Sequence, residues 1–217
     1  FEAAHPGVEL TFNFAGTQAL RTQVEHGAAV DVFASADERH MNELARAARV
    51  AAPVIFVRNE PVVIVAKEHA ATIESLAQLP GASRIVIATP EAPIGRYTLQ
   101  LLDRAATTLG AVFRARVEAK VVSRELNVRQ VLAKVSLGEA EAGVVYRTDA
   151  LAARDRVNIV SIPADINVIA RYPIAVAARA PHPELARAWV DFVLSAAGQR
   201  ALRRAGFLAP SDGAATP

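Results

Sequence analysis

Apolar and polar residues alternate strictly along residues 8–14, the pattern of a β-strand with one buried face. Small and polar residues follow, then apolar residues at helical spacing, and Gly27 ends the predicted helix. A short apolar run at residues 30–34 predicts a second strand. The three elements form a predicted strand–helix–strand unit with Thr17 in the loop after the first strand. In open α/β sheets, ligands bind at such a position.

The rest of the chain continues the same alternation of strands and helices. Side-chain caps at Asp37 and Asn127 begin two predicted helices, and a break at Gly198 divides the helical carboxyl end. The tail, residues 209–217, is expected to be disordered. Apolar runs predict further strands at residues 61–66, 84–88, 117–122, 142–146, 157–162 and 168–178. The pattern is typical of an α/β fold with mostly parallel sheets flanked by helices.

The predicted elements fall into two groups, which suggests two lobes. Residues 1–66 and 171–217 form the first lobe, and residues 67–170 form the second. The chain therefore leaves the first lobe, builds the second and returns. Two lobes joined by two crossings leave a cleft that can close on a small ligand.

Composition excludes several classes of function. The 217 residues contain 24 Lys and Arg against 22 Asp and Glu, without the basic block that would favour nucleic acid. The absence of Cys excludes thiol catalysis, disulfides and thiolate metal sites, and the five scattered His argue against zinc. No apolar run reaches the length of a membrane span. Neither a P-loop nor a Gly-x-Gly-x-x-Gly motif occurs, so nucleotide binding has no support.

Four predicted loops carry small or hydroxyl side chains at a helix start or strand end. Helix amino termini present N–H donors and a partial positive charge, which suits an oxyanion. From spacing alone, ordinary N-caps and turns are the better explanation of the same residues, because every α/β fold has such loops. An Asp31–Asp37 pair for acid–base work is disfavoured, because Asp37 is better explained as an N-cap. Charged residues beside the loops are interpreted as solvated or cleft-rim side chains: Arg96, Arg129 and Arg147.

Several motifs also resemble those of a known family, in the family's order. They are Phe14-Ala15-x-Thr17, the run from Asp31 to Asp37, Pro93-x-Gly95-x-Tyr97, Asn127-Val128-Arg129, Gly143-Val144-Val145-Tyr146 with Asp149-Ala150, and Gly206-Phe207. Taken together they resemble the molybdate-binding proteins of bacterial ABC importers. Those proteins are periplasmic receptors with the two-lobed type II periplasmic-binding-protein fold. The family's first strand and its Ala-Ser loop, which supplies another hydroxyl ligand, would precede Phe1 and are absent from this sequence.

The resemblance implies a set of ligand contacts and partners. Thr17 would contribute a hydroxyl, Ile94 and Val128 main-chain N–H groups, and Tyr146 its phenol. These groups would hold the oxygens of molybdate or tungstate, with no direct bond between protein and metal. The resemblance also implies a monomeric protein that has no cofactor and no enzymatic activity. It would deliver the oxyanion to an ABC permease in the inner membrane.

Two alternatives remain open at this point, and a third is disfavoured. The chain could be a receptor for another tetrahedral anion such as sulfate. It could be the effector-sensing domain of a transcription regulator, although such a domain normally follows a helix-turn-helix segment that this sequence lacks. A pyrrole-polymerising deaminase of similar fold is disfavoured, because its cofactor requires a Cys.

Overall fold

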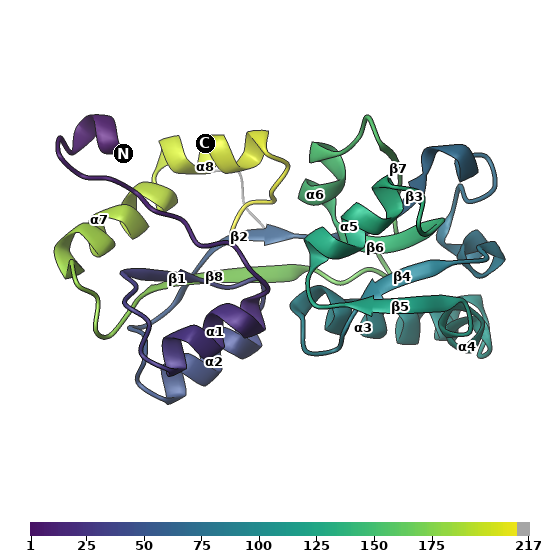
Figure 1. Ribbon diagram of the computed structural model, residues 1–217, viewed down its shortest axis with the longest axis horizontal. Coiled ribbons are helices and arrows are strands. Elements are labelled where there is room, and N and C mark those ends of the chain that lie inside the picture. Colours follow the sequence, from purple (N-terminus) through teal and green to yellow (C-terminus); the bar gives the residue numbers. More distant parts are fainter. Residues whose placement is uncertain (212–217) are drawn as a thin grey trace. The chain divides into compact units, whose positions relative to one another are not determined.

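A computed structural model describes residues 1–211 and divides into two compact units (Figure 1). Of the described residues, unit 1 contains Phe1–Arg58, Arg171–Arg204 and residues 208–211. Unit 2 contains Asn59–Ala170 and Ala205–Phe207. Among the described residues, no helix is both long enough and apolar enough to cross a membrane.

Unit 1 is built on a sheet of three strands in the order β1-β8-β2. In this sheet β1 (Val32–Ala34) pairs antiparallel with β8 (Ala170–Val176), and β2 (Val54–Asn59) lies on the other side of β8. Helices α1 (Thr17–Glu25) and α2 (Glu38–Arg46) pack against each other. Their apolar faces and the sheet share one core, which includes Val24, Phe33, Met41, Leu44, Val50 and Ala175.

The strand predicted at residues 8–14 is absent, and this prediction was wrong. The segment makes no ladder with any strand of the described chain, and the neighbour of β1 is β8. Phe12 and Phe14 are 55% and 67% exposed, and their rings stack on each other. Alternating polarity selects a strand only where another backbone pairs with it. The predicted strand–helix–strand unit is therefore limited to α1 and β1.

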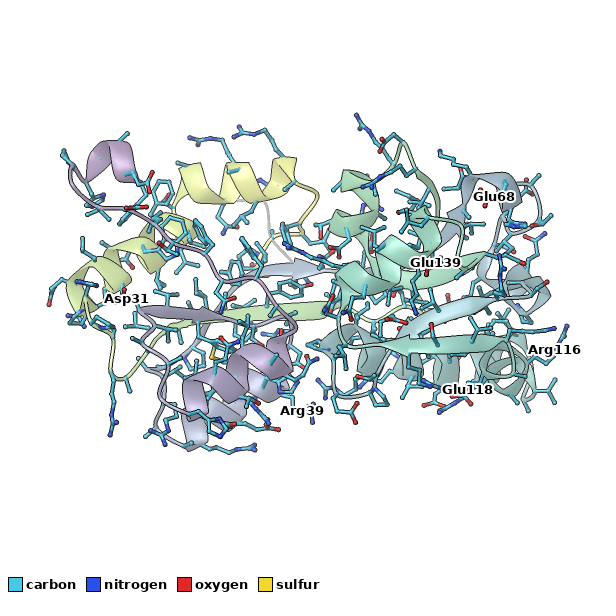
Figure 2. All side chains as sticks on the ribbon, viewed as in Figure 1. Asp31, Arg39, Glu68, Arg116, Glu118 and Glu139 are labelled. Carbon is cyan, nitrogen blue, oxygen red and sulfur yellow. The ribbon has the colours of Figure 1, made fainter. Side chains whose placement is uncertain are left out.

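Asp37 caps α2, which confirms the sequence prediction. The side chain is fully buried, and its carboxylate accepts a hydrogen bond from the His40 main-chain N–H at 2.9 Å. Asp31, which is labelled in Figure 2, has a different partner. Its carboxylate accepts a hydrogen bond from the His182 main-chain N–H at 2.7 Å. The two carboxylates thus serve two separate helix starts, at α2 and at α7 (Pro183–Leu194). This arrangement is the expected one, not an acid–base pair.

We expect replacement of Asp37 by alanine to lower the free energy of unfolding by about 1–2 kcal/mol, because it removes the acceptor for a helix N–H. Asp37→Asn keeps an oxygen acceptor at the same place and should retain most of that stability. Chemical denaturation of the two variants measures the difference. Equal losses in both would show that the carboxylate charge, not the cap, is what matters.

Unit 2 contains a five-stranded sheet in the order β5-β4-β6-β3-β7. Strand β4 lies parallel to both β5 and β6, whereas β3 is antiparallel to β6 and β7. Every residue of β3, β4 and β6 is buried, as their continuous apolar sequences predict. The strands are β3 (Pro61–Ala66), β4 (Ile85–Ala88), β5 (Val121–Glu125), β6 (Ala142–Tyr146) and β7 (Val157–Val160).

The first crossing between the units lies at Arg58–Asn59, whereas the sequence analysis placed it after residue 66. Strand β3 belongs to unit 2 because its two neighbours, β6 and β7, are both there. Its apolar sequence indicates burial but does not say in which sheet. The return crossing lies at Ala170–Arg171.

Helices cover both faces of the large sheet. Helices α3 (Pro93–Leu109) and α4 (Phe113–Glu118) lie on one face, and α5 (Val128–Ser136) and α6 (Arg147–Ala152) lie on the other (Figure 1). The strand predicted at residues 117–122 begins later, because Phe113 and Val117 form the buried side of α4. Two short 3₁₀ segments, η2 (Lys67–His69) and η3 (Leu76–Gly81), lie between β3 and β4 in the chain.

The carboxyl end differs from prediction in two details. Helices α7 and α8 (Ala196–Arg204) separate at Ser195, and Gly198 lies inside α8. A Cβ at Gly198 would come within 2.4 Å of the Phe192 carbonyl oxygen, so this glycine permits close packing of the two helices. Of the predicted disordered tail, residues 212–217 lie outside the described residues. Residues 209–211 are held by Arg58, whose guanidinium donates to the carbonyl oxygens of Ala209 and Ser211.

Candidate functional site

Three of the four predicted ligand residues lie at one edge of the large sheet. Strands β5, β4 and β6 are neighbours and run in the same direction, so their carboxyl ends meet at the same edge. Helices α5, α3 and α6 begin shortly after these ends. We call this place the carboxyl edge of unit 2. It carries Ile94, Val128 and Tyr146, as the sequence predicted for strand-to-helix loops.

The start of α3 supplies main-chain donors. Pro93 is its first residue, and the N–H groups of Ile94 and Gly95 lie in the first turn, where a helix offers them no carbonyl partner. A Cβ at Gly95 would lie 2.0 Å from the Thr89 carbonyl oxygen and 2.6 Å from that of Ala88. The first turn therefore touches the end of β4 directly. Only glycine allows Ile94 to take its buried place there.

The start of α5 is fixed by reciprocal side-chain contacts. The Asn127 side chain accepts from the Gln130 main-chain N–H at 3.1 Å, and the Gln130 side chain accepts from the Leu126 N–H at 3.0 Å. Val128 is the first residue of the helix, so its N–H points out of the first turn. The predicted cap at Asn127 is confirmed. The Val128 N–H is thus a helix-start donor on the same edge as Ile94.

Tyr146 ends β6 and immediately precedes α6. It is 4% exposed, and its ring packs edge-on against the ring of Tyr97 from α3. Its main chain lies opposite Pro61 of β3. The phenol is therefore held between two elements of the carboxyl edge, and its position depends on both.

Thr17 is the ligand residue predicted in unit 1. It is 6% exposed and is the first residue of α1. Its hydroxyl oxygen accepts from the Ala36 main-chain N–H at 3.2 Å, so the hydroxyl hydrogen can donate to another group. The adjacent Ser35 hydroxyl donates to the Asp37 carbonyl oxygen at 2.6 Å. Loop residues 35–37 and the start of α1 thus form one hydrogen-bonded corner of unit 1.

The arginines near the carboxyl edge of unit 2 interact with nearby protein groups. Arg147 pairs with Glu60 at 3.1 Å, and the Arg96 guanidinium lies 5.7 Å from the centre of the Tyr97 ring. Arg129 is exposed and acts electrostatically on Asp149 of α6. These contacts are consistent with arginines whose positive charge contributes to the electrostatic potential at the carboxyl edge of unit 2.

Asp149 is a residue whose importance the sequence analysis missed. Burial raises the pKa of its carboxyl to about 6, against the opposing effects of main-chain hydrogen bonds and of Arg129. The sequence does show a carboxylate three residues after Tyr146. It does not show the burial of that carboxylate, which depends on tertiary contacts such as the packing of α5 against α6.

The predicted donors of the two units, taken separately, are chemically alike. Ile94, Val128, Tyr146 and Thr17 offer N–H or O–H hydrogens and no charge. Such groups can hold an anion by hydrogen bonds and a favourable helix dipole. Within residues 1–211, no cluster of three or more His, Asp or Glu side chains is placed to hold a metal ion.

Comparison with known proteins identifies the family. A model of bacterial extracellular solute-binding proteins matches residues 1–208. The chain belongs to this family of solute-binding proteins. The molybdate-binding protein ModA of Mycobacterium tuberculosis is 39% identical over 213 residues, covering 97% of this chain and 77% of that protein. The resemblance found in the sequence is thereby confirmed, and the chain is a homologue of molybdate-binding proteins.

Solved structures of other binding proteins show the same fold at low sequence identity. The periplasmic molybdate-binding protein of Azotobacter vinelandii aligns with a TM-score of 0.83 at 18% identity, covering 96% of this chain and 91% of that one. The sulfate-binding protein SubI of M. tuberculosis aligns with a TM-score of 0.86 at 18% identity, covering 98% and 80%. The two-lobed α/β class expected from the sequence is therefore confirmed.

Proposed function

We propose that this solute-binding protein captures a tetrahedral oxyanion, molybdate or tungstate, in the periplasm and delivers it to an ABC permease. It acts as a monomeric receptor, without catalysis and without a resident cofactor. The observation that carries the proposal is the set of uncharged donors at the carboxyl edge of unit 2, at Ile94, Val128 and Tyr146. The 39% identical molybdate-binding protein of M. tuberculosis supports the choice of anion.

The physical argument rests on neutral donors. An oxyanion that leaves water must find a hydrogen-bond donor for each of its oxygens, and each unfilled position costs binding free energy. The edge supplies main-chain N–H groups from two helix starts and one phenol, and Thr17 of unit 1 supplies a hydroxyl. All of these groups bind oxygen atoms and none bonds the metal. Selectivity then follows from the size of the anion and from its protonation state.

Sulfate is the second candidate, because the sulfate-binding protein SubI shares the fold. Sulfate is also a tetrahedral dianion and would use the same donors. It is smaller than molybdate, so donors spaced for molybdate are too far apart to contact all the oxygens of sulfate. Calorimetric titration with molybdate, tungstate, sulfate and phosphate separates the candidates. Stronger binding of sulfate than of molybdate would replace the first proposal with the second.

Removing single hydroxyls tests which residues bind. We expect Tyr146→Phe and Thr17→Val each to weaken molybdate binding about 10- to 100-fold, since each removes one hydrogen bond to a charged ligand. Thr17→Ser retains the hydroxyl and should bind nearly as well as the unaltered chain. Calorimetric titration gives the dissociation constants.

Tyr172→Phe is a matched control for the phenol, because Tyr172 belongs to unit 1 and its ring packs against that of Phe56. It should leave molybdate affinity unchanged. Normal affinity in both Tyr146→Phe and Thr17→Val would contradict the assigned donors. No binding of any of the four anions by the unaltered, cooperatively folding chain would contradict the function itself.

A further inference from the structure

The first residues of unit 2 are hydrogen-bonded to the start of α6, the helix that follows Tyr146. Asn59 is 1% exposed, and its side-chain N–H donates to the Thr148 hydroxyl oxygen at 2.9 Å. Its side-chain oxygen accepts from the Glu60 main-chain N–H at 3.0 Å. The Arg147 main-chain N–H donates to the Glu60 carbonyl oxygen at 2.9 Å. The chain just after the first crossing is thus joined to the two residues that directly follow Tyr146.

These bonds come where the sheet holds Tyr146 least directly. In an antiparallel ladder, hydrogen-bonded pairs alternate with pairs that exchange no main-chain bond. Because Arg147 and Glu60 are a bonded pair, the preceding pair, Tyr146 and Pro61, is a non-bonded one. Strand β4 pairs with β6 only at the first two residues of β6. Tyr146 therefore depends on the bonds of its chain neighbours to keep its place beside β3.

Thr148 is held on both branches of its side chain. Its Oγ1 accepts from Asn59, and its Cγ2 lies 3.7 Å from where a Cβ would stand on Gly206. Gly206 belongs to Ala205–Phe207, the short part of the carboxyl-terminal chain that lies in unit 2. A Cβ there would also lie 2.5 Å from Cδ1 of Leu151, so this backbone passes close against α6. A branched side chain with both branches in contact has little freedom to rotate.

We propose that Asn59 and Thr148 are positioning residues for oxyanion binding, because their hydrogen bond fixes the first turn of α6 and with it the Tyr146 phenol. This inference rests on the proposed function. The Tyr146 ring packs edge-on against Tyr97, which limits its tilt, while the bond at Thr148 holds the main chain from which the ring projects. A donor that is already fixed loses less conformational freedom when the anion binds, so the anion binds more tightly.

Thr148→Val removes the hydroxyl and keeps the branched shape, so it breaks this hydrogen bond alone. We expect it to weaken molybdate binding about 10-fold, measured by calorimetric titration. Thr148→Ser retains the hydroxyl and should bind within about twofold of the unaltered chain. Thr107→Val is the matched control, because its exposed hydroxyl, in the last turn of α3, donates to the Asp103 carbonyl oxygen. It should leave molybdate affinity unchanged.

A double-mutant cycle with Tyr146→Phe distinguishes positioning from a general structural role. If Thr148 acts through the phenol, Thr148→Val should cost less than about twofold in affinity once the phenol is gone. In a cycle with Thr17→Val, which removes a donor of unit 1, the two losses should multiply. An equal loss from Thr148→Val with and without the Tyr146 hydroxyl would overturn the inference.

Other outcomes separate this inference from the proposed function. Normal affinity in Thr148→Val, with a lowered unfolding midpoint, would mean that the bond serves the fold alone and would leave the receptor function intact. Normal affinity in Tyr146→Phe would have the same meaning. Failure of the unaltered chain to bind any of the four oxyanions would overturn both. If Thr148→Val does not fold, Thr148→Ala takes its place in the cycle, because water can fill the space left at this half-buried position. Losses that simply multiply there would equally overturn the role of Thr148.

Discussion

Replacement of Gly95 by alanine should lower the free energy of unfolding of unit 2 by about 3 kcal/mol. The added Cβ would lie 2.0 Å from the carbonyl oxygen of Thr89 and 2.6 Å from that of Ala88. Both contacts are with main chain at the end of β4, so no side-chain rotation relieves them. The first turn of α3 must move away from the sheet, and the Ile94 N–H moves with it. Molybdate binding should then weaken about 10- to 100-fold, as expected for a lost charged hydrogen bond.

Gly81→Ala is the matched control, because nothing lies within 4 Å of a Cβ at that position. It should change the unfolding free energy by less than about 0.5 kcal/mol and leave binding unaltered. Denaturant titration of the two variants, followed by calorimetry with molybdate, measures both effects. An unfolding midpoint for Gly95→Ala equal to that of Gly81→Ala would show that α3 is not held against β4 in this way. Loss of stability without loss of affinity would instead exclude the Ile94 N–H as a donor.

Asp149 should make stability fall as pH rises from about 4 to about 6. Burial raises its pKa from 3.8 to about 6, so in this range the folded chain holds a proton that the unfolded chain has released. The native state is therefore penalised progressively as pH rises through this window, and the penalty is complete above the raised pKa. Allowing for partial exposure, the expected loss from this group is about 2 kcal/mol.

Asp149→Asn isolates that contribution, because an amide oxygen can accept the same main-chain N–H groups without ionising. Near pH 4 the variant and the unaltered chain should have similar stability, and at pH 7 the variant should be more stable by about 2 kcal/mol. Denaturant unfolding at several pH values gives the difference directly. A difference that does not change between pH 4 and pH 7 would mean that the carboxyl titrates normally in the folded chain.

The features that were predicted correctly from the sequence depend on residues close together in the chain. The caps at Asp37 and Asn127 are set by one side chain and an N–H three residues later, so they were read correctly. The buried strands β3, β4 and β6 were evident from continuous apolar runs. The strand predicted at residues 8–14 was wrong for the opposite reason, because alternation forms a strand only beside a partner backbone, and no strand of the described chain pairs with this segment.

The candidate site shows the same division. The sequence alone determined the family, the two-lobed α/β class and the helix-start character of Ile94 and Val128, because motifs and caps are short stretches of chain. Only the tertiary structure decided that these donors share one sheet edge with Tyr146, since strand order and direction place them there. It also decided that β3 belongs to unit 2 and that Asp149 is a perturbed acid. Both depend on contacts between segments far apart in the chain, which local sequence patterns do not encode.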